Sequence, residues 1–587
     1  MARFCAIRIP PTSNAHDTAA RLGIRAVALA TAMLASAAPG LAADVTPERL
    51  LNPDREPQNW LMNHRTYNGQ RFSPLARINK DNVNGLKLAY AVPLGGTTGD
   101  EWIEATPLVE NGFIYITDSW GVLYKIDATS GEAGRIVWRM EPKQERQANN
   151  RGAALWGNLV ISPANWPARI VATDKETGKV VWETNVSFDQ PQLRITAAPL
   201  AIKDRIVIGA SGGDSGVRDW VAALDAASGR VLWRKFTIPA PGEPGSETWK
   251  GANNAWQTGG GAVWVTGTYD PATNQTFWGT GNPVPMFDPF HRPGDNLYTN
   301  SAISWDPETG KMNWYFQYTP GDMWDYDEVG THILIDGEVA GQQRKLITHS
   351  ARNGFLYTME RANGAIVAVK PYLDNVNWTK GIDPKTGKPV DYDPNKEIQT
   401  YAGMSNLVPG QPLKKVCPSQ AGGNNYFPSS YSQRTKLIYI PALTACVDIA
   451  IDREKHNKER GWNGGLSTTT DRWESNLTAV DPMTGEVKKS IHLRYPNYSG
   501  TLATAGGLIF LALLDGTIAA YDENTLDELW KVNVGAGFTA PPMTFEVNGR
   551  QYVAIASGAS AVSRAKLVNT PALRDQRQAT ILYVFAL

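Results

Sequence analysis

The stretch Leu224-Asp225-Ala226-Ala227-Ser228-Gly229-Arg230-Val231-Leu232-Trp233 decides the fold of this chain. It joins two apolar runs through an Asp, a small hydroxyl residue and a Gly. An Asp starts such a turn by accepting backbone N–H groups, and Gly takes the left-handed position without steric cost. The stretch therefore predicts a β-hairpin with a Trp on its second strand.

Further copies of this hairpin phrase follow one another along the chain. Where copies are adjacent, their turn Asp residues lie about 40 to 50 residues apart, and a Trp repeated at a fixed offset from a hairpin is typical of a β-propeller with docked blades. At about 60 to 70 residues per blade, insertions included, the length predicts eight blades in one all-β domain, with seven as the alternative. The copies run from Asp174 to Trp182, Asp306 to Trp314, Asp127 to Trp138, Asp481 to Val487 and Asp522 to Trp530.

The first 43 residues differ from the rest. Arg21 and Arg25 precede an apolar run from Ala26 to Ala38, and small residues follow, up to Ala42 and Ala43. This pattern predicts a secretory signal peptide over residues 1–43, cleaved near its end. A membrane anchor is the alternative, but the run is short for a bilayer span. We expect residues 44–587 to be exported as a propeller without a membrane span.

Charge and metal-type residues exclude several classes of protein. The chain has 57 basic and 57 acidic residues, which argues against nucleic acid or an anionic membrane as its main partner. Its seven His show no ligand-like spacing, so a zinc site is not expected. There is no Cys-x-x-Cys-His sequence, and no covalent c-type haem is therefore expected in this chain.

Two cysteines remain after the predicted signal peptide, Cys417 and Cys446. An even pair in an exported chain predicts a disulfide, with two free thiols as the alternative. Closing a loop of this length would stabilise the fold by roughly 3–4 kcal/mol. Residues 371–430 lack the hairpin phrase and are rich in Asp, Lys, Pro and Gly. We interpret them as a cap over one end of the channel, held by the disulfide, with a disordered surface loop as the alternative.

Hard oxygen donors occur in three separate turns. Asp325 and Asp327 lie in Trp324-Asp325-Tyr326-Asp327, Asn282 follows Gly279-Thr280-Gly281, and Asp214 ends Ser211-Gly212-Gly213-Asp214. Carboxylate and amide oxygens suit Ca²⁺ or a similar hard cation rather than zinc. A carboxylate that carries neither proton nor metal can act as a general base.

Together with the repeats, these turns resemble the quinoprotein alcohol dehydrogenases, which use pyrroloquinoline quinone (PQQ). The resemblance covers nearly the whole chain after residue 43, because it also includes Tyr67-Asn68-Gly69-Gln70-Arg71-Phe72-Ser73-Pro74-Leu75, Thr501-Leu502-Ala503-Thr504-Ala505-Gly506-Gly507 and Gly535-Ala536-Gly537-Phe538-Thr539-Ala540-Pro541-Pro542. It implies an eight-bladed propeller with the cofactor and a cation near the axis.

The resemblance also implies a set of cofactor residues. PQQ carries three carboxylates, so its pocket needs arginines and hydrogen-bond donors, and its planar ring stacks well on indole. Trp264 matches the floor under the quinone. The other matching cofactor residues are Glu104, Arg151, Thr196, Ser211, Gly212, Gly213, Arg352 and Asn425.

The chemistry that the resemblance implies is alcohol oxidation. Asp214 and Asn282 would hold the cation, with Asp325 close by and Asp327 as a further ligand. The cation would polarise the quinone carbonyl, and Asp325 would take the hydroxyl proton of the alcohol. Hydride would pass from the alcohol to PQQ. Electrons would then leave one at a time to a separate cytochrome c in the periplasm.

Three departures from the family pattern stand out. Most relatives carry adjacent cysteines before the residue that corresponds to Arg151, whereas this chain has Glu145 and Arg146. In those relatives the two cysteines form a strained ring over the cofactor. Without this cysteine ring we expect a more open site, which suits a bulky or secondary alcohol. Asp214 replaces a Glu, and Asp327 is an additional acid. Asp327 compensates for the shorter Asp214 around Ca²⁺, or supplies charge for a trivalent lanthanide, or lies outside the metal site; we expect Ca²⁺.

Three other functions compete with this interpretation. A sugar or polyol dehydrogenase would use the same cofactor site. A non-catalytic propeller scaffold would keep the hairpin phrases and lose the polar residues at the axis. A hydrolase with paired carboxylates would use Asp325 and Asp327 but gives no role to Trp264.

Overall fold

The computed structural model describes residues 44–97, 101–402, 408–452, 456–457, 461–469, 472–565, 567, 570–573 and 576–587. The predicted signal peptide lies outside these residues. Within them, β-strands dominate, and the two α-helices have five residues each, α1 (Pro47–Leu51) and α2 (Ala561–Ala565). No helix of the described part is long and apolar enough to cross a membrane.

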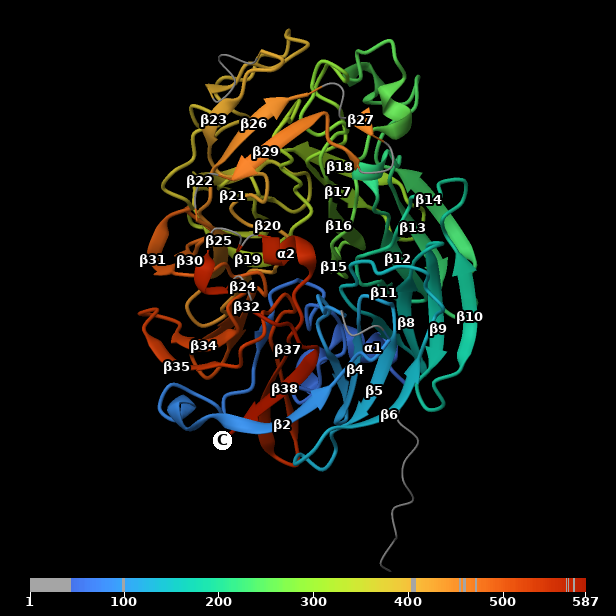
Figure 1. The fold of residues 1–587 in the computed structure, drawn as a ribbon, viewed down its shortest axis with the longest axis vertical. Helices are drawn as coiled ribbons and strands as arrows, with labels where there is room; N and C mark the ends of the chain where they lie inside the picture. Colours follow the sequence, from blue (N-terminus) through green and yellow to red (C-terminus); the bar gives the residue numbers. More distant parts are fainter. Residues whose placement is uncertain are drawn as a thin grey trace, which may run out of the picture. The chain divides into compact units, whose positions relative to one another are not determined.

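Eight antiparallel sheets of four blade strands each confirm the predicted all-β, eight-bladed propeller (Figure 1). The first four blades are β3 (Leu108–Glu110), β4 (Phe113–Thr117), β5 (Leu123–Asp127) and β6 (Arg135–Met140); β7 (Ala154–Trp156), β8 (Leu159–Ala164), β9 (Arg169–Asp174) and β10 (Val180–Asn185); β11 (Leu200–Ile202), β12 (Arg205–Gly209), β13 (Trp220–Asp225) and β14 (Val231–Phe236); β15 (Thr268–Asp270), β16 (Gln275–Gly279), β17 (Ser301–Trp305) and β18 (Met312–Gln317).

The other four blades follow the same plan, with longer insertions. They are β19 (Ile333–Val339), β20 (Gln342–Ser350), β21 (Phe355–Glu360) and β22 (Ile366–Pro371); β24 (Ser430–Tyr431), β25 (Ile438–Leu443), β30 (Ser475–Val480) and β31 (Val487–Leu493); β32 (Thr501–Thr504), β33 (Leu508–Ala512), β34 (Thr517–Asp522) and β35 (Glu528–Asn533), with β1 (Phe72–Ser73) parallel to β32; β36 (Met543–Val547), β37 (Arg550–Ala556), β38 (Ile581–Ala586) and β2 (Lys87–Pro93).

The last blade joins strands from the two ends of residues 44–587. β2 pairs antiparallel with β38, from Lys87 opposite Ala586 to Pro93 opposite Ile581. In Figure 1 the blue β2 therefore lies beside the red β38. Tyr552 of the same blade donates its hydroxyl to the carbonyl of Gly131 in the first blade, at 2.8 Å. The ring of blades is thus closed by a sheet ladder and not by a loop.

Tryptophans dock each of several blades onto the next one, as the hairpin phrase predicts. The indole of Trp233 donates to the carbonyl of Pro307 at 3.0 Å and packs on Gly310. Gly310 has φ +67°, so this Gly is needed both for the turn and as a flat seat for the indole. The equivalent indole bonds run from Trp138 to Lys175, Trp182 to Ala226, Trp314 to Arg361 and Trp530 to Leu86, at 3.0–3.2 Å.

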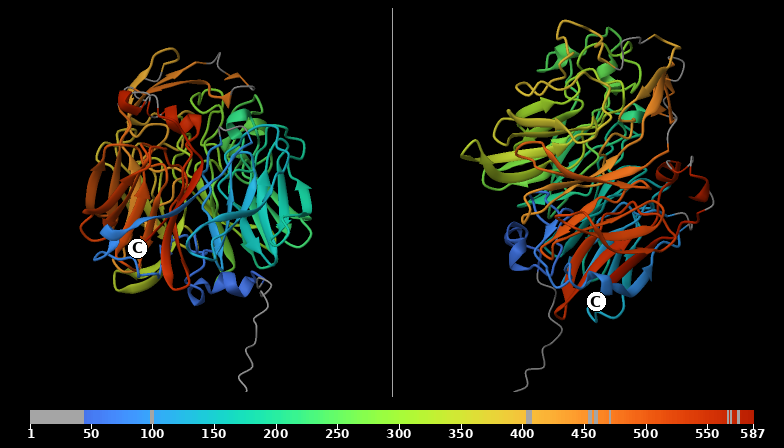
Figure 2. Two further views of the ribbon diagram at one scale, coloured as in Figure 1. Left: turned by 60° about the horizontal axis from the view of Figure 1, so that its bottom comes forward. Right: turned by 90° about the vertical axis from the view of Figure 1, so that its left-hand side faces the viewer.

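A small sheet outside the blades is built from two insertions. β23 (Leu413–Val416) comes from the first one, and β26 (Val447–Ile451) and β29 (Gly465–Thr469) come from a second one between β25 and β30. Figures 1 and 2 show this sheet apart from the ring. A short ribbon, β27 (His456–Asn457) and β28 (Gly461–Trp462), adds to the second insertion. That insertion was not singled out from the sequence.

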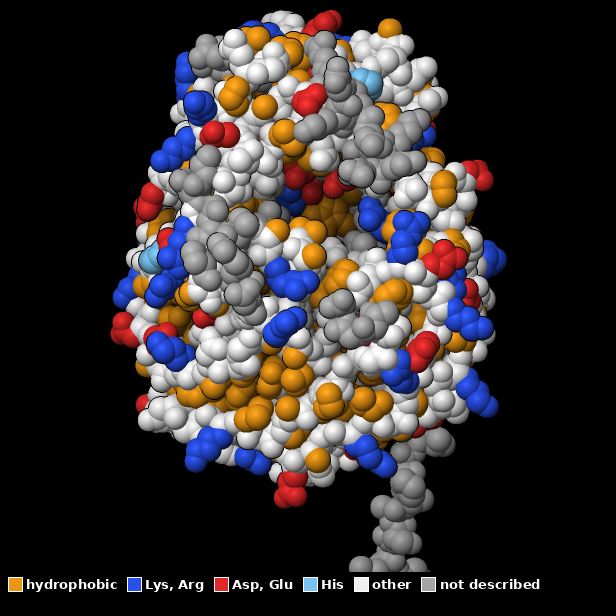
Figure 3. Space-filling view, in the orientation of Figure 1, with side chains coloured by type: hydrophobic (Ala, Val, Ile, Leu, Met, Phe, Trp, Pro, Cys, Tyr) orange, Lys and Arg blue, Asp and Glu red, His pale blue; other side chains and the backbone are white. Residues whose placement is uncertain are grey.

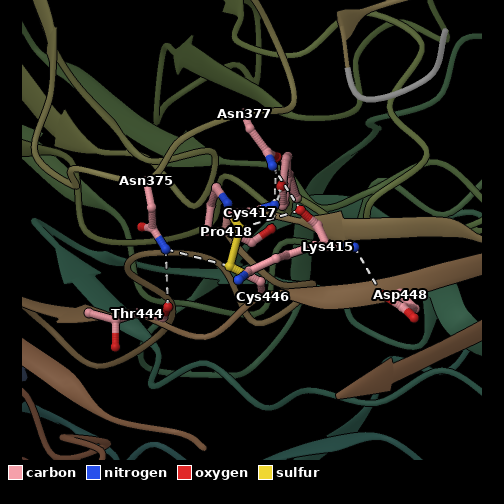
Figure 4. Close-up of a disulfide and its surroundings, with 9 residues drawn as sticks. Asn375, Asn377, Lys415, Cys417, Pro418, Thr444, Cys446 and Asp448 are labelled. Atoms are coloured by element: carbon pink, nitrogen blue, oxygen red, sulfur yellow. Dashed lines mark hydrogen bonds between the residues drawn. A yellow bond between two sulfur atoms is a disulfide. The ribbon is translucent and has the colours of Figure 1, made fainter. Parts of the chain in front are cut away.

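The predicted disulfide between Cys417 and Cys446 is present and ties the two insertions together (Figure 4). Around it, the backbone N–H of Cys417 donates to Asn377 Oδ1 at 2.8 Å, and the backbone N–H of Lys415 donates to Asp448 Oδ1 at 2.9 Å. The chain after Cys417 is therefore held at its start before it runs on to residues 420–426.

Candidate active site

A cavity of about 480 Å³ opens where loops from all eight blades meet. Figure 3 shows it as a central hollow with acidic and basic side chains above an apolar floor. All thirteen cofactor and metal residues predicted from the sequence line this cavity: Glu104, Arg151, Thr196, Ser211, Gly212, Gly213, Asp214, Trp264, Asn282, Asp325, Asp327, Arg352 and Asn425. The first and the last of these predicted residues, Glu104 and Asn425, are 321 positions apart in the sequence.

Trp264 presents an indole between two arginines. The guanidinium carbons of Arg151 and Arg352 lie 4.5 and 5.7 Å from its ring centroid. Its Nε1 donates to Asp327 Oδ2 at 3.1 Å, which fixes the plane of the ring. A flat aromatic surface with two guanidinium groups close to its ring suits a planar anionic ligand.

Arg151 is paired with a fully buried acid. Its Nη2 lies 2.8 Å from Glu104 Oε2, and its Nη1 donates to the carbonyl of Trp264 at 3.0 Å. Burial raises the pKa of Glu104, and the charge of Arg151 opposes that rise. The buried Nε–H of Arg151 has no acceptor among the described residues. This arginine therefore keeps a donor for a ligand.

Arg352 holds the loop of the two predicted site acids in place. Its Nη1 donates to the carbonyl of Asp325 at 2.7 Å, and its Nη2 lies 2.9 Å from Asp327 Oδ2. Glu328, which is fully buried, accepts the backbone N–H of Arg352 at 2.9 Å. Gly422 allows this arrangement, because a Cβ there would overlap the side chain of Arg352.

The charge of Asp327 raises the pKa values of the other two acids of the predicted metal set. Burial, then the charge of Asp327, raises the pKa of Asp214 to about 6. The same two causes raise the pKa of Asp325 well above its usual value. Asp325 also has a left-handed backbone, φ +66°, which Asp tolerates better than most residues. A left-handed residue in a cavity is a mark of a functional site.

Asp327 already has donors on both of its oxygens. Oδ1 accepts the backbone N–H of Asn282 at 2.5 Å, and Oδ2 accepts from Trp264 and pairs with Arg352. Gly281 makes room for it, because a Cβ there would overlap Asp327 Oδ1. Asp327 therefore connects the indole, the arginine and the Asn282 turn.

A fourth buried acid, Asp219, was not predicted from the sequence. Its side chain is inaccessible to solvent, and neither carboxylate oxygen has a hydrogen-bond partner among the described residues. Burial, then the charge of Asp214, raises its pKa well above the usual value. Since Asp219 lies at the start of an ordinary blade strand, no signal in the sequence marks it as a site residue.

The acids fit a hard cation by charge, but they are not assembled around one point. In the part of the chain that the structure describes, no three His, Cys, Asp or Glu side chains stand ready to hold a metal ion. The Asn282 side chain hydrogen-bonds Asp214 and lowers its pKa. The predicted set thus offers Asp214, Asn282 and Asp325, and leaves room for oxygen atoms of a ligand.

The smaller predicted residues fill the cavity wall. Thr196 and Ser211 place hydroxyl groups there, and Gly212, with φ +122°, passes so close that a Cβ would lie 2.7 Å from the carbonyl of Gln192. Asn425 is held within its own loop, donating to the carbonyl of Ala421 at 2.9 Å and accepting from the backbone of Tyr426 at 2.8 Å.

Glu145 and Arg146, which stand where most relatives have the adjacent cysteines, do not line the cavity. They border a separate hollow, where Arg146 stacks on Trp166 at 4.2 Å. The next three residues line the cavity instead, and Asn149 Oδ1 accepts the indole N–H of Trp102 at 3.2 Å. Other lining residues not predicted from the sequence are Trp102, Gln147, Ala148, Asn149, Arg194, Ala262, Gln420, Ala421, Tyr426, Tyr498, Ser560, Val562 and Ser563.

Comparison with known families and structures matches these features. Residues 60–370 and 462–553 match the family model described as PQQ, glucose/ethanol/alcohol dehydrogenase, beta-propeller domain. The quinohemoprotein alcohol dehydrogenase of Comamonas testosteroni is 35% identical over 84% of this chain and 71% of its own length. The quinoprotein alcohol dehydrogenase PedH of Pseudomonas putida is 32% identical over 88% of this chain and 89% of its own length.

Two solved structures extend the similarity to the fold. The quinohemoprotein alcohol dehydrogenase ADHIIG of Pseudomonas putida has a TM-score of 0.84 at 30% identity, over 93% of this chain and 83% of its own. A europium-containing methanol dehydrogenase has a TM-score of 0.83 at 28% identity, over 92% of this chain and 100% of its own.

Proposed function

Because this chain belongs to the family of PQQ-dependent alcohol dehydrogenases, we propose that its cavity oxidises a bulky or secondary alcohol to the ketone or aldehyde, in the periplasm, with a cytochrome c as electron acceptor. The observation that carries the proposal is the convergence of Asp325, Trp264 and Arg352 in one cavity. A base, a stacking surface and a carboxylate-binding cation are what alcohol oxidation on a tricarboxylate quinone requires.

The residues present fit PQQ. Trp264 offers the stacking face, and Arg151 and Arg352 have buried Nε–H groups without an acceptor among the described residues. Such unmet donors cost free energy unless a ligand accepts from them. The carboxylates of PQQ would do so. When bound, the quinone would supply a hydride acceptor, with a cation polarising its carbonyl.

Asp325 is the residue we assign as general base. Its carboxylate lies in the cavity, 3.7 Å from Arg352 Nη1 through Oδ2. A raised pKa makes its ionised form a better proton acceptor, while the nearby arginine keeps that form accessible. Asp325 would take the hydroxyl proton of the alcohol on a carboxylate oxygen as the carbon is oxidised.

Ca²⁺ is the cation we propose, with a lanthanide as the alternative. Both oxygens of Asp327 are engaged by protein donors, which leaves Asp214 and Asn282 to hold the cation, with Asp325 close by. A carboxylate and an amide, with a second carboxylate nearby, suit a divalent ion. The europium in the similar methanol dehydrogenase supports the alternative.

The variant Asp327→Ala separates the two ions. If Ca²⁺ is the metal, we expect Asp327→Ala to lower Ca²⁺-dependent activity, because Asp327 then serves to position Arg352 and Trp264. La³⁺ should not restore the lost activity. Loss of activity with La³⁺ but not with Ca²⁺ would favour the lanthanide. Asp336→Ala, at an exposed acid outside the cavity, is the control and should leave both activities unchanged.

An open cavity supports a large substrate. No cysteine ring covers it, and Val562, which lines it, is 73% exposed. The predicted signal peptide supports export, and the absence of a Cys-x-x-Cys-His sequence supports a separate cytochrome. Dye reduction by the PQQ- and Ca²⁺-loaded protein, over primary alcohols, bulky secondary alcohols, polyols and sugars, tests the proposal. Secondary alcohols should give the highest kcat/KM; a preference for methanol or for sugars would contradict the substrate class.

A further inference from the structure

Arg194 is a third arginine of the cavity, and neither the hairpin phrases nor the family resemblance assigns it a role. Its backbone forms a two-way bridge with Ser211, each N–H donating to the other's carbonyl at 2.8 Å. Alternate residues of an extended segment face the same side, and Thr196, two positions later, also lines the cavity. Arg194 is thus anchored between two predicted cofactor residues.

The other two arginines are matched by acids of the protein, whereas Arg194 is not. Arg151 pairs with Glu104 at 2.8 Å and Arg352 with Asp327 at 2.9 Å. For Arg194, no carboxylate of the described residues lies within ion-pair distance. The guanidinium makes one long hydrogen bond, from Nη2 to Ser215 Oγ at 3.4 Å, and its buried Nε–H has no acceptor there.

The residues around Arg194 contact its guanidinium group but do not accept all of its hydrogen bonds. Its guanidinium lies 5.5 Å from the ring of Trp166, and Arg146 lies 4.2 Å from the same ring. The nearest balancing charges act at longer range, from Asp214 and Asp219. A cation bound at Asp214 would neutralise part of the negative charge that balances Arg194. An anion in the cavity would then be the remaining partner for Arg194.

We propose that Arg194 is a third carboxylate-binding arginine of the cavity and that it pairs with a carboxylate of bound PQQ; this inference rests on the proposed function. PQQ carries three carboxylates, and the two arginines expected from the family are partly engaged by Glu104 and Asp327. A guanidinium with unused donors beside Ser211 completes the set. A planar fork of N–H groups is well matched to a carboxylate.

The test is PQQ binding by the metal-loaded apoprotein, measured by quenching of tryptophan fluorescence at saturating Ca²⁺. Arg194→Gln should raise the Kd for PQQ roughly 10- to 100-fold, as expected for the loss of a charge-assisted hydrogen bond. Arg194→Lys should recover part of the affinity. Arg146→Gln removes the other charge on Trp166 without touching the cavity, and should change the Kd little.

The PQQ trimethyl ester distinguishes the carboxylates from the ring. Wild type should bind the ester less tightly than PQQ, and Arg194→Gln should reduce that difference. A natively folded Arg194→Gln variant with wild-type affinity for PQQ would overturn the inference. So would a variant that loses only Ca²⁺ affinity, or only raises KM for a hydroxy acid substrate, because Arg194 would then serve the acids or the substrate. If wild type itself does not bind PQQ, the proposed function fails as well.

Discussion

At the scale of single residues, the cavity places several acidic side chains near a small number of arginines. Asp219 is fully buried, Asp325 is partly buried and Asp214 reaches the surface of the cavity. The charge of Asp214 raises the pKa values of both Asp219 and Asp325. Arg352 contacts Asp325 and Asp327 but not Asp219. Without a metal ion the cluster is short of positive charge, which is costly in a buried site. The acids therefore destabilise the metal-free fold and favour cation binding.

This imbalance predicts a pH dependence of stability. The pKa of Asp214 is about 6 in the fold against 3.8 in the unfolded chain, so the folded state binds the proton more tightly. The associated stability is present below about pH 4 and is lost as pH rises through 6, and because Asp214 is solvent-exposed, screening makes the loss smaller than the pKa difference alone implies. In EDTA, Asp214→Asn should therefore be more stable than wild type at pH 7 and about equal at pH 4, by urea unfolding.

Calcium gives the matching control for that experiment. Ca²⁺ should stabilise wild type more at pH 7 than at pH 5, since it competes with a proton below pH 6, and should stabilise Asp214→Asn much less. An Asp214→Asn variant that is less stable than wild type in EDTA at pH 7 would show that the acid cluster is not strained.

Most of the cavity could be predicted from the sequence, because its residues sit in long phrases shared with a known family. Asp214, Asn282, Asp325 and Arg352 all lie in such phrases, and the structure places them together. Asp219 and Arg194 could not be predicted in this way. Their importance comes from burial and from missing partners, which depend on neighbours far away in sequence.

At the scale of elements, the blade hairpin is a docking device as well as a turn. The Asp fixes the turn, the Gly takes the left-handed backbone, and the Trp of the preceding blade rests on that Gly. Because each of these three roles requires a particular residue type, the phrase can be recognised in the sequence. The turn at Asp383 follows the same rules inside an insertion, where Asp383 Oδ1 accepts the N–H groups of Lys385 and Thr386. It was not recognised from the sequence, because no Trp follows it at the usual offset.

Gly310→Ala tests the double role of the turn Gly. A methyl group there meets left-handed strain of about 1–2 kcal/mol and would also lie 2.6 Å from Cε3 of Trp233. We expect a loss of roughly 2–4 kcal/mol in the free energy of unfolding. Gly341→Ala is the matched control, since Gly341 has φ +78° with nothing within 4 Å. Equal losses in the two variants, measured by denaturant unfolding, would contradict the docking role.

The disulfide links the insertions to the cavity wall. Gln420, three residues after Cys417, accepts from Arg352 Nη1 at 3.1 Å through its carbonyl. Replacing both cysteines by Ser should cost roughly 3–4 kcal/mol and should weaken PQQ binding, because the loop that supports Arg352 loses its anchor. Calorimetry and PQQ titration check the two effects. Wild-type PQQ affinity in the double variant would show that the loop is held by other contacts.

At the scale of the whole molecule, the ring explains why distant residues meet. Loops from blades all around the ring supply one cavity, with lining residues that run from Trp102 to Ser563 in the sequence. Pairing of β2 with β38 fixes the ring at its seam. Length and repeat spacing left seven or eight blades open, because the repeats are irregular; the strand order settles on eight. The second insertion could not be predicted from the sequence, because it interrupts a blade between β25 and β30 and has no hairpin phrase of its own.

The role of Asp325 in alcohol oxidation can be tested by single-turnover reduction of bound PQQ by a secondary alcohol. Wild-type protein loaded with PQQ and Ca²⁺ should show the absorbance change of quinone reduction within one turnover. Asp325→Asn should bind PQQ with nearly the same Kd and reduce it at least about 100-fold more slowly, because the hydroxyl proton has no acceptor. Reduction at the wild-type rate in Asp325→Asn would show that Asp325 is not the base, and no reduction by any alcohol in wild type would show that the cavity does not oxidise alcohols.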